Sequence, residues 1–154
     1  MASHSLVETI LGLEANYNSV LTRSHHLFQF RLAQPFKNYL CNMTPAEINK
    51  KFTVLQERLA KDFDTETPDI KVILFLIGVQ ELGQGPQKFS KRQKEELMHI
   101  ATCRLFSEMG FYELEGLDQD GWPHWKLVKA IPAYTLLEQE MIIKSLIVGY
   151  FEAL

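Results

Sequence analysis

The sequence predicts a compact, mainly α-helical domain of four or five helices, with one β-hairpin at about residues 111–128 before the C-terminal helix. Apolar residues recur at helical spacing in several segments, and Ser or Thr three positions before Glu or Gln marks helix starts. Two alternating runs on either side of a turn rich in Gly and Asp indicate the hairpin. The length of 154 residues fits a single domain, which we assign to residues 1–154.

The amino-terminal part begins with an apolar stripe. Five residues of this stripe recur at spacings of three and four: Leu6, Ile10, Leu13, Tyr17 and Val20. The spacing predicts an amphipathic helix over residues 5–22, weakly interrupted by Gly12. Residues 25–39 fit neither the helical nor the strand period, so a helix and an extended segment both stay open there.

A well-marked helix is predicted at residues 45–62. Thr44-Pro45-Ala46-Glu47 is a capping box, in which the hydroxyl of Thr44 and the carboxylate of Glu47 each satisfy a backbone amide. Pro45 suits the first helical position because its missing N–H would have no partner there. An apolar stripe follows at helical spacing: Ile48, Phe52, Leu55, Leu59 and Phe63.

Residues 70–82 are apolar on nearly every side. A helix without a polar face is typical of a central, enclosed element, whereas the β-branched content leaves a buried strand as the alternative. Thr67-Pro68-Asp69 before the segment and Gly83 after it favour the helix. We expect the helices of residues 45–109 to pack against one another, with the hairpin added outside them.

The next helix begins after Ser90 and is predicted to run to Met109. Ser90-x-x-Gln93 is a second capping box, and Gly110 is a typical helix stop. Apolar residues form two stripes on roughly opposite sides of this helix, which indicates that its C-terminal half is covered on both sides. The stripes are Leu97, Ala101, Leu105 and Met109, and Ile100, Cys103 and Phe106.

Two short alternating runs, 111–115 and 122–128, predict the strands of the hairpin. Asp120-Gly121 favours the chain reversal between them, because Gly readily adopts the left-handed conformation of tight turns. Thr135-x-x-Glu138 is a third capping box, and it begins a last helix predicted at residues 136–152.

Composition bounds the classes of function. The net charge of −3 and the pI near 5.9 provide no overall basic field for nucleic acid or an anionic membrane. Cys41 and Cys103 lie far apart, which favours reduced thiols and a cytoplasmic location. The amino-terminal residues lack the basic region of a signal peptide. The most apolar stretch, Val72–Val79, is eight residues long, and a bilayer-spanning helix needs about 20.

Glu96-Leu-Met-His99 is the first candidate for chemistry. A carboxylate and an imidazole at i and i+3 share a helix face and can bind a divalent metal together. Glu81 and His124 are the further candidate ligands. A di-iron site of this type needs a second Glu-x-x-His, which the sequence lacks, so we favour a solvated Glu96 and a His99 that is hydrogen-bonded at the edge of the apolar face.

Both tryptophans lie within Trp122-Pro-His-Trp125. In a strand, Trp122 and His124 would point to one side and Trp125 to the other. Exposed aromatic side chains are frequent anchors of binding surfaces, so these three residues are candidates for contact with a partner. The alternative, which we favour, is that the large rings cover the core.

Lys88, Lys91 and Arg92 surround the predicted helix start at Ser90 and are candidates for binding an anion. The order of three helices and a hairpin also suggests a winged helix, whose third helix would enter the major groove of DNA. Acidic residues on the hairpin oppose that role, because phosphates would repel them: Glu113, Glu115, Asp118 and Asp120. We therefore favour a solvated charged surface and expect nucleic acid not to be the partner.

Three segments, Gly78–Gly83, Lys94–Ala101 and Gly110–Gly116, together with Gly121-Trp-Pro-His-Trp125, resemble a family of small bacterial proteins without an assigned function. The resemblance covers about residues 70–152. It implies a free-standing bacterial cytosolic protein, and it implies no activity, cofactor or catalytic residue.

No nucleophile motif, phosphate loop or zinc spacing is present in the sequence. Our leading hypothesis is therefore a non-enzymatic domain that binds a protein partner or forms a homodimer. A metal-binding protein or metal-dependent enzyme built on the Glu-x-x-His helix is the alternative. A nucleic-acid-binding variant of the winged helix comes third.

Overall fold

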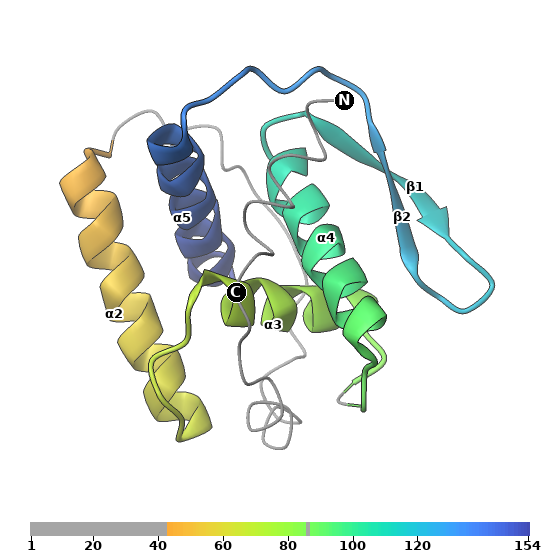
Figure 1. The fold of residues 1–154 in the computed structure, drawn as a ribbon, viewed down its shortest axis with the longest axis horizontal. Coiled ribbons are helices and arrows are strands. Elements are labelled where there is room, and N and C mark those ends of the chain that lie inside the picture. Colours follow the sequence, from red (N-terminus) through yellow and green to blue (C-terminus); the bar gives the residue numbers. More distant parts are fainter. Residues whose placement is uncertain (1–42, 86) are drawn as a thin grey trace.

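A computed structural model describes residues 43–85 and 87–154 (Figure 1). These residues form four helices and one hairpin, in the order α2 (Pro45–Phe63), α3 (Ile70–Leu82), α4 (Lys91–Ser107), β1 (Tyr112–Leu117), β2 (Pro123–Leu127) and α5 (Leu136–Glu152). The mainly α-helical prediction, with a hairpin before the C-terminal helix, is confirmed. The helix predicted over residues 5–22 and the open segment 25–39 lie outside the described residues.

All three capping boxes are formed. The hydroxyls of Thr44, Ser90 and Thr135 each accept a hydrogen bond from the backbone N–H three residues further on. The side chain at that third position accepts in return from the N-cap backbone, as in Thr135 N to Glu138 Oε2 at 2.7 Å. These helix starts are therefore determined by a few adjacent residues, which explains why they could be predicted from the sequence.

The apolar segment 70–82 is a helix, so the alternative of a buried strand is wrong. The carboxylate of Asp69 caps the helix by accepting from the backbone N–H of Val72 at 2.8 Å. Gly83 ends it in the left-handed conformation, with φ of 67°. These two local signals outweigh the β-branched content. Every residue from Lys71 to Val79 is buried, as expected for an enclosed helix.

The helices form two pairs. α3 crosses α4 and packs closely on it, whereas α2 packs chiefly on α5, as Figure 1 shows. The expectation that the helices of residues 45–109 pack mainly on one another is therefore wrong for α2. The stripe of α2 needs an apolar surface, and α5, which is far away in the sequence, provides it.

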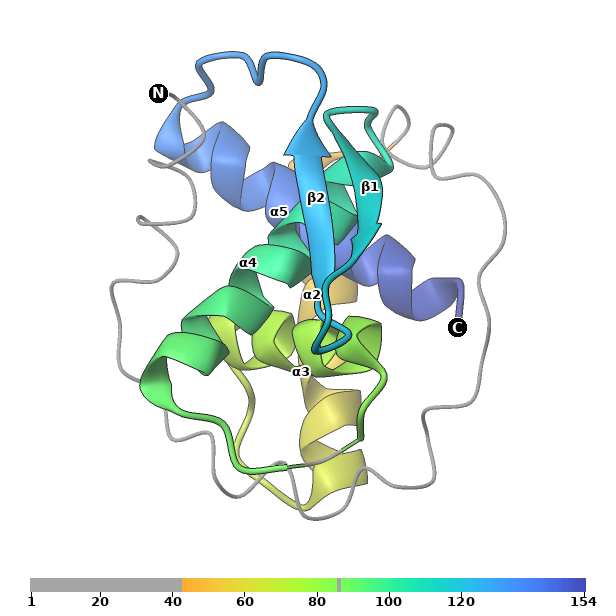
Figure 2. The ribbon, with the colours of Figure 1, turned by 90° about the vertical axis from the view of Figure 1, so that its right-hand side faces the viewer.

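The hairpin lies against α4, as Figure 2 shows. β1 and β2 pair antiparallel, with a bulge between Leu114 and Gly116. β1 continues past this bulge to Leu117, two residues beyond the predicted end of its run. The chain reverses at residues 118–122, where Gly121 has φ of 81° and Asp118 N donates to the carbonyl of Trp122. The predicted role of Gly121 in the reversal is confirmed.

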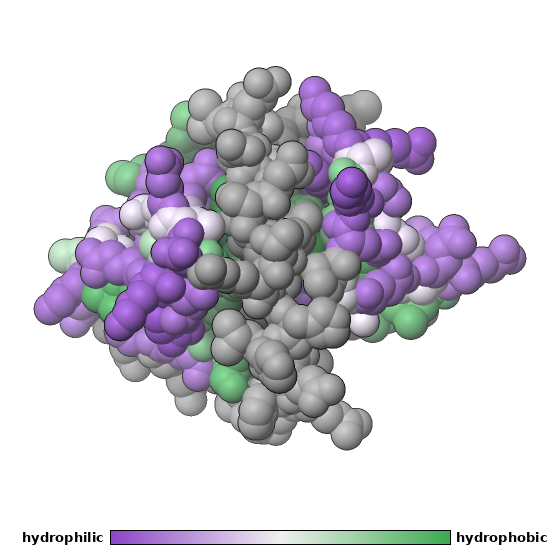
Figure 3. Space-filling view, turned by 90° about the horizontal axis from the view of Figure 1, so that it is seen from below, coloured by the Kyte–Doolittle hydropathy of each residue, from purple (hydrophilic) through white to green (hydrophobic). Residues whose placement is uncertain are grey.

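Among the helices of the described part of the chain, none combines the length and the apolar character that crossing a membrane requires. Hydrophilic side chains cover much of the described surface in the view from below, and hydrophobic side chains show in smaller areas (Figure 3).

Candidate functional site

The structure does not bring the four candidate metal ligands together. Glu96 and His99 are exposed on α4, and Glu81 lies half-buried on α3. His124 is exposed on β2, where its Nε2 is 3.2 Å from Asp118 Oδ2. Within residues 43–85 and 87–154, no group of three or more His, Cys, Asp or Glu side chains could hold a metal ion. Within this part of the chain, no third ligand therefore lies beside Glu96 and His99 to complete a metal site.

Glu81 belongs instead to a polar network that joins three helices. The hydroxyl of Tyr150 on α5 donates to Glu81 Oε1 at 2.8 Å, and Arg104 Nε of α4 lies 3.6 Å from Glu81 Oε2. Arg104 also pairs with Glu108. Burial, and then the neighbouring charge of Glu81, raises the pKa of Tyr150. The network therefore holds α3, α4 and α5 in register as a structural element.

His99 has a sulfur neighbour on its own helix. His99 Nε2 and Cys103 Sγ lie 3.5 Å apart, one turn of α4 from each other. Cys103 is fully buried, and burial raises the pKa of its thiol to about 12. A thiol that keeps its proton in this way is a weak nucleophile and a weak metal ligand at neutral pH.

The tryptophans of the hairpin contribute to the core. Trp122 meets the ring of Phe89 edge-on, with ring centroids 6.5 Å apart, and Trp125 is partly buried against the same core. Their side chains do not alternate as a regular strand predicts, because β2 begins only at Pro123 and leaves Trp122 in the turn. His124 is the exposed member, with 57% of its side chain accessible.

The candidate anion-binding residues Lys88, Lys91 and Arg92 are all exposed at the start of α4. The exposed face of this helix also carries Glu95 and Glu96, so its charge is mixed. The amide that Ser90 caps already has its acceptor, since Gln93 N donates to Ser90 Oγ. This end of α4 is thus a solvated surface of both signs in the described structure.

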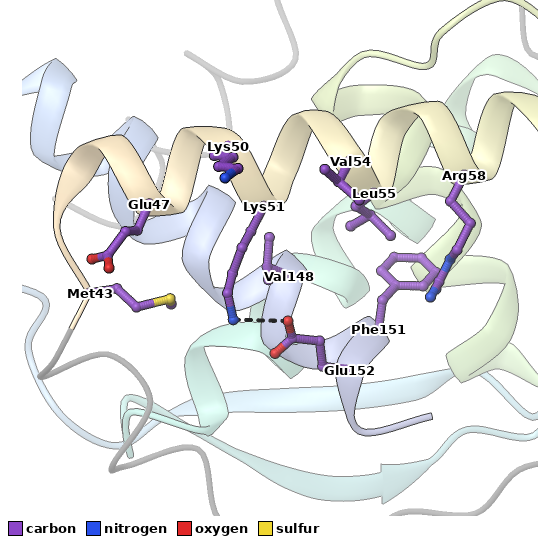
Figure 4. A pocket seen from close by; sticks show the side chains of 10 residues that line it. All are labelled: Met43, Glu47, Lys50, Lys51, Val54, Leu55, Arg58, Val148, Phe151 and Glu152. Carbon is purple, nitrogen blue, oxygen red and sulfur yellow. Dashed lines mark hydrogen bonds and ion pairs between the residues drawn. The ribbon is translucent and has the colours of Figure 1, made fainter.

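A groove lies between α2 and α5 (Figure 4). It is called the α2–α5 groove below. Its volume is about 710 Å³. Apolar side chains and the stems of longer charged ones line it together. The lining residues are Met43, Glu47, Lys50, Lys51, Val54, Leu55, Arg58, Val148, Phe151 and Glu152.

The rim of the α2–α5 groove carries three basic and two acidic side chains. Lys51 Nζ pairs with Glu152 Oε1 at 3.1 Å, across the groove from α2 to α5 (Figure 4). The carboxylate of Glu47 accepts from the backbone N–H of Thr44, which lowers the pKa of Glu47. Lys50 and Arg58 make no ion pair with any residue of the described part. Two cations on the rim are therefore available to an acidic partner.

A second, smaller hollow of about 260 Å³ continues the α2–α5 groove and shares Arg58 and Phe151 with it. Leu76 and Ile77 of α3 form part of its apolar lining. Gln80 Oε1 is buried there and has no hydrogen-bond partner among the described residues. The groove and this hollow therefore adjoin, and together they are bordered by α2, α3 and α5.

Sequence reasoning did not find the α2–α5 groove. Val54 is apolar and 58% exposed, and it lies outside the buried stripe of α2. Such an apolar residue on the polar face of an amphipathic helix was the one signal in the sequence that could have indicated a binding surface here. The other wall comes from Val148 and Phe151, about 95 residues further along the chain, so no local pattern could reveal that the two meet.

No protein-family model, curated protein or solved structure matches this chain.

Proposed function

We propose that this chain is a non-enzymatic, cytoplasmic interaction domain that binds a protein partner in the α2–α5 groove. One observation carries the proposal: apolar side chains of two helices, with Val54 exposed among them, line one groove that has cations on its rim. Val54 alone leaves 58% of its surface accessible. Exposed apolar surface framed by charged residues is typical of a protein-binding site.

The chemistry of the groove favours an amphipathic helix as the bound element. Along α2 the groove runs from Glu47 to Arg58, which is about 17 Å at the rise of an α-helix, and Met43 continues it beyond the helix start. A helix of four turns would lay one apolar stripe over Val54, Val148 and Phe151. Acidic residues beside that stripe would meet Lys50 and Arg58. Such pairs on the surface add specificity more than affinity.

The experiment compares capture of partners from the native cytosol by three forms of the full chain. Val54→Glu places a carboxylate inside the groove, and we expect it to lose the partner that the wild type retains. Ala46→Glu adds the same charge at an exposed site on α2 that lines none of the hollows described above, and it should retain the partner. Retention of the same partner by Val54→Glu would rule out the α2–α5 groove as the binding surface.

A fourth form separates the groove from the hairpin. His124 is exposed, so His124→Ala removes its contact surface at little structural risk. Loss of the partner in His124→Ala, and not in Val54→Glu, would assign binding to the hairpin. Light scattering of the same proteins tests whether the partner is a second copy, since the wild type would then be a dimer and Val54→Glu a monomer.

A further inference from the structure

We propose that residues 5–22 of this same chain occupy the α2–α5 groove in the resting protein, so that a partner must displace them. This inference rests on the proposed function, because it takes the groove as a docking surface. It adds an autoinhibitory occupant from within the chain. Three observations support this occupant: the place where the chain enters the groove, the length of the apolar stripe, and the charge.

The first observation is the entry point. Met43, the first described residue, is half-buried and lines the α2–α5 groove. The chain that precedes it therefore begins at one end of the groove. Residues 23–42 connect the segment 5–22 to that point, and 20 residues can extend over as much as about 66 Å. Reach is thus sufficient for the segment to lie along any part of the groove.

The second observation is a match of length and pattern. The apolar stripe of residues 5–22 extends from Leu6 to Val20, which corresponds to about 21 Å in a helix. The residues of α2 that line the groove extend over about 17 Å, from Glu47 to Arg58, and Met43 continues the lining beyond the start of the helix. A single stripe at spacings of three and four is the pattern by which a helix binds an apolar groove.

The third observation is charge. Residues 5–22 contain two carboxylates, Glu8 and Glu14, and no Lys, Arg or His. The rim of the groove carries Lys50 and Arg58, which make no ion pair within the described residues, while Lys51 pairs with Glu152. Of the two carboxylates, Glu14 flanks the apolar stripe and can approach one of these cations, whereas Glu8 lies on the opposite side of the predicted helix. Tethering raises the effective concentration of such a segment to the millimolar range, so a modest affinity is enough for occupancy.

The inference can be tested by a disulfide scan in the full chain with Cys41→Ser. Cys103 is buried and stays out of reach of the exposed cysteine that Val54→Cys provides. Val54→Cys is combined in turn with Ile10→Cys or Leu13→Cys, on the apolar stripe. The matched controls combine it with Glu8→Cys or Ala15→Cys, which would lie on the opposite side of the predicted helix. Circular dichroism checks that all four proteins are folded.

We expect monomers cross-linked through position 10 or 13 to form at least about tenfold faster than those linked through 8 or 15, because only the stripe faces the groove. Equal rates at all four positions, or no cross-linked monomer, would overturn the inference. Cross-linked dimers in place of monomers would also overturn it and would assign the groove to the segment of a second copy.

A second measurement uses Leu13→Asp and, as its control, Ala15→Asp. Leu13→Asp places a charge on the apolar stripe and should release the segment from the groove, whereas Ala15→Asp should not. If the segment occupies the groove in about 90% of wild-type molecules, its release raises the retention of a partner roughly tenfold. Unchanged retention in Leu13→Asp contradicts autoinhibition. If the disulfide scan fails while Val54→Glu still loses its partner, this inference falls and the proposed function stands. If the scan succeeds and Val54→Glu keeps its partner, the proposed function falls.

Discussion

Gly78 of α3 lies directly against the backbone of Leu97 in α4. A Cβ atom at position 78 would be 2.1 Å from the carbonyl oxygen of Leu97 and 2.6 Å from its carbonyl carbon. Both atoms belong to the backbone of α4 at a fully buried residue, so neither can move aside as the end of a flexible side chain can. The α3–α4 crossing, which forms the centre of the core, therefore depends on the absence of a side chain at position 78.

Gly78→Ala should destabilise the domain strongly. The added methyl group forces α3 and α4 apart, and we expect a loss of about 3 kcal/mol or more in the free energy of unfolding. Urea unfolding followed by circular dichroism measures this loss. Glu95→Ala, on the exposed face of α4, is the control and should stay within about 0.5 kcal/mol of the wild type. A Gly78→Ala protein as stable as this control would contradict the close crossing.

Tyr150→Phe should destabilise the domain moderately. The change removes only the hydroxyl that donates to Glu81 Oε1 at 2.8 Å. Because the acceptor is a partly buried carboxylate, we expect a loss of about 1.5 kcal/mol in the free energy of unfolding. Tyr134→Phe removes a hydroxyl from a half-buried tyrosine outside the network and serves as the matched control. Equal stability of the two variants would show that the Tyr150–Glu81 hydrogen bond contributes nothing.

Stability should fall at alkaline pH because of Cys103. Burial raises the pKa of its thiol from 9.0 to about 12. Below pH 9 the folded and unfolded chains both keep this proton. Between pH 9 and 12 only the folded chain keeps it, so the free energy of unfolding decreases with rising pH, by up to about 1.4 kcal/mol per pH unit.

Cys103→Ala removes this titration, so its stability should decline less steeply over the same range. Urea unfolding at a series of pH values from neutral to about pH 11 measures both slopes. The comparison uses slopes and not absolute stabilities, because the smaller alanine also leaves a cavity in the core. Parallel slopes for the two proteins would mean that the thiol titrates alike in the folded and unfolded chains.

Asp118→Ala should loosen the hairpin turn. The carboxylate accepts hydrogen bonds from the backbone N–H of Trp122 at 2.8 Å and of Asp120 at 2.9 Å. The contact with Trp122 is the largest cause of the lowered pKa of Asp118, and His124 contributes as well. Without the carboxylate, Trp122 should separate from Phe89, which a red shift of tryptophan fluorescence would report.

The control for this variant is Asp120→Ala, whose side chain makes no hydrogen bond within the described residues. A lowered pKa means that the carboxylate stabilises the turn at neutral pH, and that this support is lost as the pH falls below the ordinary value of 3.8. Wild-type fluorescence should therefore shift in acid toward that of Asp118→Ala. Identical spectra for Asp118→Ala and Asp120→Ala at neutral pH would contradict the role of Asp118.

Local signals in the sequence were sufficient to locate the described helices. Thr44, Ser90 and Thr135 mark starts because a capping box is complete within four residues. Gly83 marks an end because it adopts a left-handed backbone conformation at no steric cost. The end of α4 at Ser107, two residues before the predicted Met109, shows the usual uncertainty at a helix terminus.

The candidate sites were less predictable. Glu-x-x-His spacing shows that Glu96 and His99 share a helix face, but it says nothing of a third ligand from another element. The placement of Glu81 beside Tyr150 and Arg104 depends on how three helices pack. The prediction that Trp122 and His124 point to one side was wrong, because Trp122 precedes β2 and contacts Phe89, whereas His124 is exposed.

The sequence by itself determined where the described helices start and stop, that the segment 70–82 is enclosed, and that a hairpin precedes α5. Each of these depends on residues a few positions apart. Only the tertiary structure decided that α2 packs on α5 and that apolar residues of both helices line one groove. The physical reason is that apolar burial is not directional: the stripe of α2 could be covered by any apolar partner, and only the packing of the whole chain selects one.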